Sequence, residues 1–156
     1  MQQMARDGAR ARARRASNLL VAAVVLHALS IPIGLALFKV LVESVAQRSV
    51  SWGEIFGALE QTGFLALILA GIVGQTVFAV LAALGAFLLR SGRTQAAIPM
   101  LIAGVIGVIF SLAVFGGIIG AIGGGLMAVG GAKGRPKPPM PWAYPPSTYG
   151  PPPYRP

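Results

Sequence analysis

The sequence lacks most of the residues from which catalytic and metal sites are usually built. Its 156 residues include no cysteine, one histidine and only four acidic residues. Without cysteine there are no disulfides and no thiolate metal sites, and a single histidine cannot form a histidine metal cluster. A Ser-His-acid triad requires an acid close to His27, whereas the acids are Asp7 and three glutamates within residues 43–60. We therefore expect no enzymatic activity, no cofactor and no metal site.

Charged residues are scarce as well, at 11% of the chain against 55% hydrophobic residues. This composition is far from that of a soluble domain. Four apolar blocks are each long enough to span, or nearly span, the hydrocarbon core of a bilayer. The sequence therefore predicts an all-α, polytopic membrane protein whose bundle covers residues 19–132. The predicted transmembrane helices occupy residues 19–42, 64–89, 96–114 and 117–132.

Two polar side chains interrupt the first two predicted spans, His27 and Gln75. A polar group in hydrocarbon marks a functional site by default, and the structural alternative is an interhelical hydrogen bond worth roughly 1 kcal/mol. No acidic residue accompanies them at that depth, so the structural interpretation is favoured over a proton relay through His27. Ser17 or Asn18 is expected to cap the start of the first span.

The longest predicted loop, residues 43–62, contains an amphipathic segment. Ser51 and Glu54 have the spacing of a capping box. From Trp52 onward, apolar residues recur at helical spacing on one face. This pattern predicts a short amphipathic helix on the outer membrane interface, with Trp52 as its interface anchor. The alternative is that the segment begins the second span early.

The last two spans are dense in small residues that recur every four positions. On a helix, such rows form flat grooves that let two backbones approach closely in lipid. The stretch is too long for one span, so it predicts a tight transmembrane hairpin that bends at residues 115–117. The candidate packing residues are Gly116, Gly120 and Gly124, with Gly117 and Gly125 in a second row and Ala103, Gly107 and Ser111 upstream.

The C-terminal segment, residues 133–156, is rich in proline and tyrosine. From Pro136 onward, prolines at this density permit neither a helix nor a strand, so we expect residues 138–156 to be disordered and polyproline-II-like. Pro151, Pro152 and Tyr154 belong to a P-P-x-Y string that resembles the ligand of WW domains. We interpret the tail as a general interaction segment for a protein partner.

The placement of the basic residues favours four spans and sets the predicted orientation. With four spans, all but Lys39 and Arg48 of the 13 basic residues fall on the side that holds both termini. The positive-inside rule makes this side cytoplasmic. We therefore expect a multi-pass protein of the cell membrane with both termini in the cytoplasm. The basic N-terminus, residues 1–18, is expected to meet anionic lipid headgroups, and nucleic acid is not the expected partner.

The layout resembles small prokaryotic four-helix membrane proteins of the domain-of-unknown-function type. The resemblance covers residues 19–132 and is clearest at 101–107 and 116–131. It implies the same topology and no catalytic residues. Two functional hypotheses remain open. The first is a structural or interaction protein, a scaffold that presents its cytoplasmic tail; the second is an oligomeric small channel or transporter packed through glycine rows. Because polar residues in the spans are few and scattered, the scaffold hypothesis leads.

Overall fold

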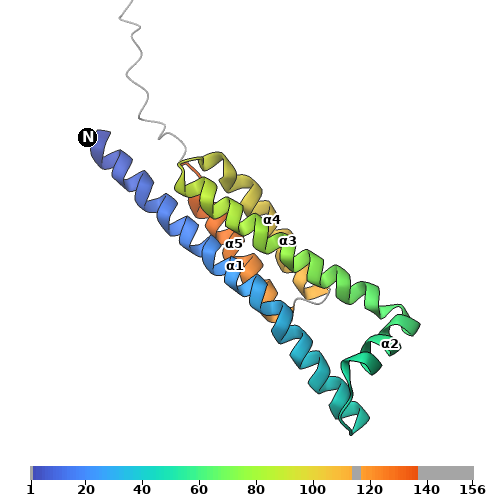
Figure 1. Ribbon diagram of the computed structural model, residues 1–156. Helices are drawn as coiled ribbons and strands as arrows, with labels where there is room; N and C mark the ends of the chain where they lie inside the picture. The colour runs from blue at the N-terminus through green and yellow to red at the C-terminus, as the bar shows by residue number, and fades with distance from the viewer. Residues whose placement is uncertain (1, 114–116, 137–156) are drawn as a thin grey trace, which may run out of the picture.

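The computed structural model describes residues 2–113 and 117–136, and these form five α-helices and one 3₁₀ turn (Figure 1). Four of the helical segments are long and apolar enough to cross a membrane. The predicted all-α class with four transmembrane helices is confirmed, and the chain is a multi-pass membrane protein. The elements are α1 (Gln2–Ala46), α2 (Trp52–Thr62), α3 (Phe64–Arg90), η1 (Thr94–Ala96), α4 (Ala97–Ala113) and α5 (Gly117–Gly134).

Helix α1 begins well before the predicted first span. Its 45 residues include the basic N-terminal segment, because alanine and arginine are both good helix formers. At 1.5 Å per residue the helix is about 67 Å long, roughly twice the thickness of the hydrocarbon core. The predicted cap at Ser17 or Asn18 is wrong, because no helix starts there. The Ser17 hydroxyl instead donates a hydrogen bond of 3.1 Å to the carbonyl oxygen of Ala86 in α3.

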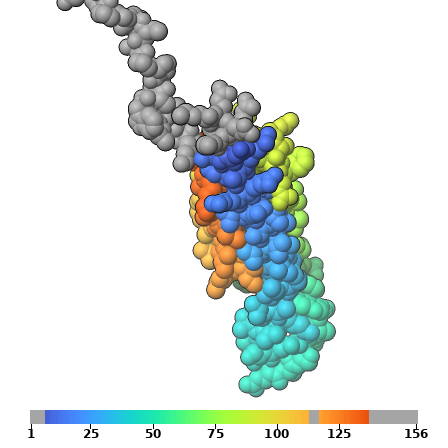
Figure 2. All heavy atoms as spheres, turned by 90° about the vertical axis from the view of Figure 1, so that its left-hand side faces the viewer, coloured from blue at the N-terminus to red at the C-terminus, as the bar shows by residue number. Residues whose placement is uncertain are grey.

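Helix α1 packs along both α5 and α3, while α4 and α5 form the glycine-rich hairpin. Figure 2 shows α1 between α5 and α3 on one face of the molecule. Many large apolar side chains point outward, among them Leu37, Phe87 and Ile118, which are 64%, 68% and 74% exposed. A surface of this kind is favourable when hydrocarbon covers it. This apolar surface extends over the long helices, as expected of a bundle that spans the bilayer.

Helix α2 is a separate element that lies between the far ends of α1 and α3 (Figure 1). Both halves of the capping box are present: the Glu54 amide donates to Ser51 Oγ at 3.3 Å, and the Ser51 amide donates to Glu54 Oε2 at 2.8 Å. Gly63 ends the helix in the left-handed conformation, with φ 77°, which glycine adopts without strain. The segment therefore does not begin α3 early.

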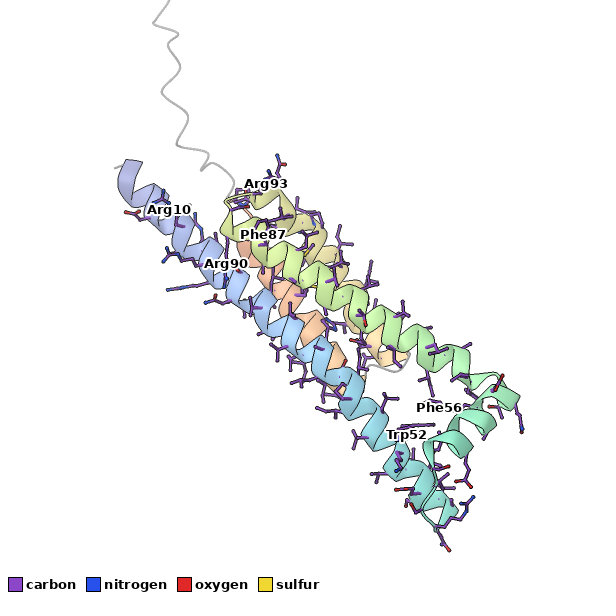
Figure 3. All side chains as sticks on the ribbon, viewed as in Figure 1. Arg10, Trp52, Phe56, Phe87, Arg90 and Arg93 are labelled. Atoms are coloured by element: carbon purple, nitrogen blue, oxygen red, sulfur yellow. The ribbon has the colours of Figure 1, made fainter. Side chains whose placement is uncertain are left out.

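Trp52, the predicted interface anchor, ties α2 to α1. Its ring stacks on Phe56 with 5.6 Å between centroids, and the Lys39 Nζ atom lies 5.7 Å from its ring centroid. Contacts of this cation–π type are electrostatic attractions to the face of the indole. Figure 3 shows Trp52 and Phe56 at the opposite end of the molecule from the arginines at positions 10, 90 and 93.

We expect α2 to loosen in acid because Glu54 belongs to its capping box. The backbone hydrogen bond from Ser51, then the Ser51 hydroxyl and Arg48, hold the pKa of the Glu54 carboxyl below its usual range. A carboxyl whose pKa is lower in the folded state stabilises that state above its ordinary pKa. This contribution disappears as the pH falls through the lowered value.

The emission of Trp52 reports this change in a Trp142→Phe chain, in which Trp52 is the remaining tryptophan. We expect constant emission at neutral pH and a shift only as the pH falls below the ordinary pKa range of a glutamate side chain. A matched chain that also carries Glu54→Gln should lack this acid transition. A transition of equal size in both chains would contradict the assignment to Glu54.

Candidate functional site

Three buried polar side chains from three helices meet inside the bundle, and we call them the polar centre. His27 of α1, Gln75 of α3 and Ser111 of α4 are all at most 1% exposed. His27 Nδ1 lies 2.6 Å from Gln75 Oε1, and Gln75 Nε2 donates to Ser111 Oγ at 2.8 Å. Because an amide oxygen can only accept, His27 Nδ1 carries the proton and donates it. The amide of Gln75 thus connects α1 to α4.

Aromatic rings and glycine backbones enclose the polar centre. The imidazole of His27 stacks on Phe78, with 5.6 Å between the ring centroids. On the side of α5, a Cβ atom at Gly123 would lie 3.2 Å from His27 Nε2, and one at Gly120 would lie 2.8 Å from Ser111 Oγ. These distances leave no room for larger residues. The fourth transmembrane helix can therefore approach the polar centre because it presents glycine there.

One atom of the polar centre has no hydrogen-bond partner in the described part of the chain, namely Nε2 of His27. With the proton on Nδ1, this nitrogen has a free lone pair, and it faces Gly123. The described residues contain no group of three or more His, Cys, Asp or Glu side chains able to hold a metal ion. Nothing among protein-family models, curated proteins or solved structures matches this chain.

Two other polar side chains of the spans, Ser30 and Thr76, bond within their own helix. Ser30, also buried, donates to the His27 carbonyl oxygen at 2.7 Å. Thr76 is exposed on the outer surface, although it follows Gln75 directly, and it donates to the Ile72 carbonyl oxygen at 2.9 Å. Apart from Ser17, which lies about 15 Å from His27 along α1 and bonds to α3, the buried polar side chains of the described residues therefore lie at one place in the bundle and form no stripe along it.

The contact between α4 and α5 depends on glycines that face the opposite backbone. A Cβ atom at Gly124 would lie 2.6 Å from the backbone nitrogen of Val108 and 2.9 Å from the carbonyl oxygen of Gly104. Gly104 and Gly131 face backbone atoms of the partner helix in the same way. Gly107 lies opposite Gly124, and Ala103, half-buried, packs against the core. Backbone contacts this close are possible only without side chains.

The second predicted row, Gly117 and Gly125, does not lie at these contacts. A Cβ atom added at either position would meet no heavy atom of the described residues within 4 Å. Each residue of a helix advances by about 100°. Gly123 faces α1 and Gly124 faces α4, so Gly125 is rotated away from both. Of the first row, Gly116 lies outside the described residues, as do Pro151, Pro152 and Tyr154 of the tail.

A packing row outside the predicted rows faces α1 and α3. Besides Gly123 it contains Gly130, which lies against Leu20, and Gly134, which lies against Leu89. The interval of seven between Gly123 and Gly130 corresponds to two helical turns and was the available signal. Helix α5 thus presents glycine on two adjacent faces, one toward α4 and one toward α1 and α3.

The two ends of the bundle differ in charge. The basic end is formed by the start of α1, the connection between α3 and α4, and the end of α5, and Figure 3 shows Arg10, Arg90 and Arg93 there. The opposite end, with α2, contains two ion pairs: Lys39–Glu43 at 3.6 Å and Arg48–Glu54 at 3.2 Å. Basic side chains are therefore neutralised at that end and accumulate at the other.

Proposed function

We propose that this protein is an integral membrane protein of structural or interaction type, a scaffold that presents its Pro/Tyr-rich tail, residues 133–156, to a protein partner. The observation that carries the proposal is the closed interior of the bundle. The polar centre uses its hydrogen bonds to join three helices, and glycine backbones pack against it from the fourth. Buried polar networks that are largely satisfied rigidify a bundle. A bundle with such an interior can act as a rigid support from which the tail is presented.

The charge difference between the ends supports a cytoplasmic tail. The basic end is also the end at which α5 stops, at Gly134, so the first two residues of the tail are still helical. Lysine and arginine concentrate in cytoplasmic segments of membrane proteins, and acidic residues have little influence on orientation. By this rule the basic end faces the cytoplasm. The tail and the N-terminus are then available to partners on the same side of the membrane.

The second candidate function, an oligomeric small channel or transporter packed through glycine rows, is favoured by two observations. The free lone pair of His27 Nε2 can accept a proton within the bundle. A Cβ atom at Gly125 would meet no heavy atom of the described residues within 4 Å, so this small residue is left for contact with a second copy. Under this alternative, ion flux depends on the bundle and not on the tail.

Deletion of residues 138–156 is the experiment that separates the two. We expect the truncated protein to insert and melt as the full chain does, because dense prolines and singly spread aromatic residues cannot form a cooperative core. Capture of partners in a crosslinking pull-down should be lost. Lys133, Arg135 and Lys137 are retained so that the cytoplasmic end of α5 keeps its charge.

A full-length chain with Pro151, Pro152 and Tyr154 replaced by alanine is the matched control. If the tail is a general interaction segment, this control still captures partners, whereas the deletion does not. Capture that survives the deletion, together with ion flux in liposomes that also survives it, would overturn the scaffold in favour of the channel or transporter.

A further inference from the structure

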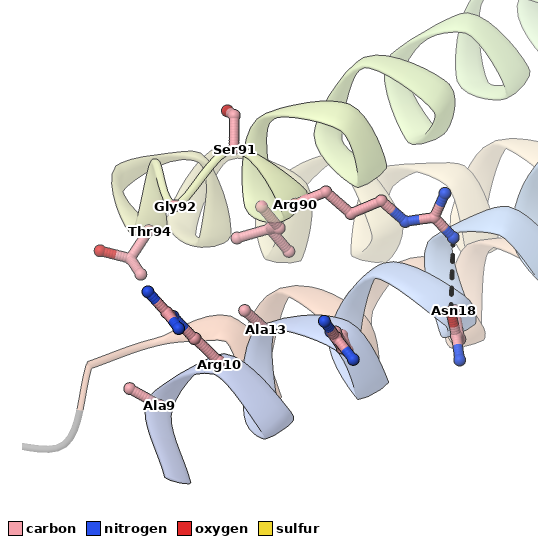
Figure 4. A pocket seen from close by; sticks show the side chains of 10 residues that line it. Ala9, Arg10, Ala13, Asn18, Arg90, Ser91, Gly92 and Thr94 are labelled. Atoms are coloured by element: carbon pink, nitrogen blue, oxygen red, sulfur yellow. Dashed lines mark hydrogen bonds between the residues drawn. The ribbon is translucent and has the colours of Figure 1, made fainter. Parts of the chain in front are cut away.

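A groove lined by arginines lies at the basic end, between the first half of α1 and the end of α3. It has a volume of about 850 Å³. Figure 4 shows it from close by, with Arg10 directed toward Thr94 and Arg90 directed toward Asn18. The charged lining residues are Arg10, Arg14 and Arg90. We call this feature the arginine groove.

The three arginines come from two helices and line the same groove. Arg10 and Arg14 are one turn apart on α1, so they project from the same face of that helix. Arg90 is the last residue of α3, and its Nη2 donates to Asn18 Oδ1 at 3.5 Å. None of the three forms a salt bridge with a described residue. The groove therefore concentrates positive charge that the described chain does not neutralise.

The depth of the groove matches the boundary between hydrocarbon and water. Val21 on α1 and Phe87 on α3 are outward-facing apolar residues, 41% and 68% exposed. Asn18 lies within one helical turn of Val21, and Arg90 lies within one turn of Phe87, both on the side of the basic end. From Asn18 to Arg10 the groove extends by about 12 Å along α1, which covers a headgroup layer of about 5–7 Å.

We infer that the arginine groove binds the phosphodiester headgroup of an anionic phospholipid. A guanidinium group forms two parallel hydrogen bonds with phosphate, and three arginines along one groove between two helices offer a headgroup phosphate more donors than scattered surface charge does. Basic pockets between transmembrane helices are sites at which anionic headgroups bind. Its opening at headgroup depth selects a phosphate carried by a lipid. The inference goes beyond the scaffold function and does not depend on it.

The test titrates short-chain phosphatidylglycerol onto the full chain in a nonionic detergent and follows binding by native mass spectrometry. The variant Arg10→Gln/Arg14→Gln removes two arginines from the groove. Its matched control, Arg12→Gln/Arg15→Gln, removes the same charge from other faces of α1, at positions that do not line the groove. We expect an apparent Kd roughly tenfold or more higher for the first variant and within about twofold of the parent for the control.

Further measurements distinguish a lipid from free phosphate, and a loss of binding from a loss of folding. Arg90→Gln, on a different helix, should also weaken binding, which keeps the test decisive if the double variant melts early. Phosphatidylcholine should bind much more weakly than phosphatidylglycerol, and millimolar inorganic phosphate should not displace the lipid. Equal losses in the two double variants would overturn the inference in favour of diffuse charge attraction, and displacement by inorganic phosphate would overturn the assignment to a lipid.

Discussion

Replacement of Gly124 by alanine is expected to lower the melting temperature of the detergent-solubilised protein by several degrees, and Gly124→Leu should lower it further. An added Cβ atom would lie 2.6 Å from the backbone nitrogen of Val108, a distance that real Cβ contacts do not reach. Neither neighbouring backbone can rotate away as a side chain can. The two helices must separate, and overpacking of this kind costs about 1–3 kcal/mol.

The matched control for this prediction is Gly125→Ala, one residue along the same helix. The added methyl group there meets open space. Alanine favours a helix over glycine by about 0.5–1 kcal/mol at either position, so this gain cancels in the comparison. We therefore expect opposite signs, with Gly125→Ala slightly more stable than the parent. Equal melting temperatures for Gly124→Ala and Gly125→Ala would show that Gly124 is not at a backbone contact.

Replacement of Gln75 by leucine is expected to produce the second large effect, a loss of about 1–3 kcal/mol in the free energy of unfolding. The amide of Gln75 is the partner of both His27 Nδ1 and Ser111 Oγ. Its removal leaves a buried N–H donor and a buried hydroxyl without their partner. Thr76→Val is the control, because Thr76 is exposed and bonds to Ile72 in its own helix.

A double-mutant cycle identifies the origin of this loss. When both partners of a buried hydrogen bond become apolar, most of the desolvation penalty disappears. The variant His27→Leu/Gln75→Leu should therefore be more stable than the sum of the two single losses predicts. A purely additive result, or a Gln75→Leu protein as stable as Thr76→Val, would mean that the polar centre does not hold the helices together.

Both predictions follow from the way in which helices associate in lipid. Hydrocarbon competes equally well for apolar side chains, so the association of transmembrane helices depends on close packing and on interhelical hydrogen bonds. In this bundle the two contributions occur side by side. Gly120 packs against Ser111 and Gln75, and Gly123 packs against His27. The small residues allow α5 to approach, and the polar centre sets which helices it meets.

The sequence by itself determined the features that depend on local length and composition. Four apolar segments of sufficient length predicted the four transmembrane helices, because the bilayer sets the required length. The capping box of α2 was predictable from Ser51 and Glu54 alone, since a helix start places residues i and i+3 in contact. Helix α1 starts at Gln2, well before the predicted span, because that span's boundary followed hydrophobicity, whereas arginine and alanine sustain a helix beyond the membrane.

Only the tertiary structure decided which faces of these helices meet. Glycine spacing predicted that Gly117 and Gly125 pack against another helix, whereas in the structure Gly123 and Gly130 pack against α1. The partners in the polar centre are 48 and 36 residues apart, and Asn18 meets Arg90 across 72 residues. The physical reason is that a soluble helix marks its buried face by polarity, whereas a membrane helix is apolar on the side toward lipid and on the side toward its neighbours. Its rotation about its own axis is then set by packing and hydrogen bonds to other helices.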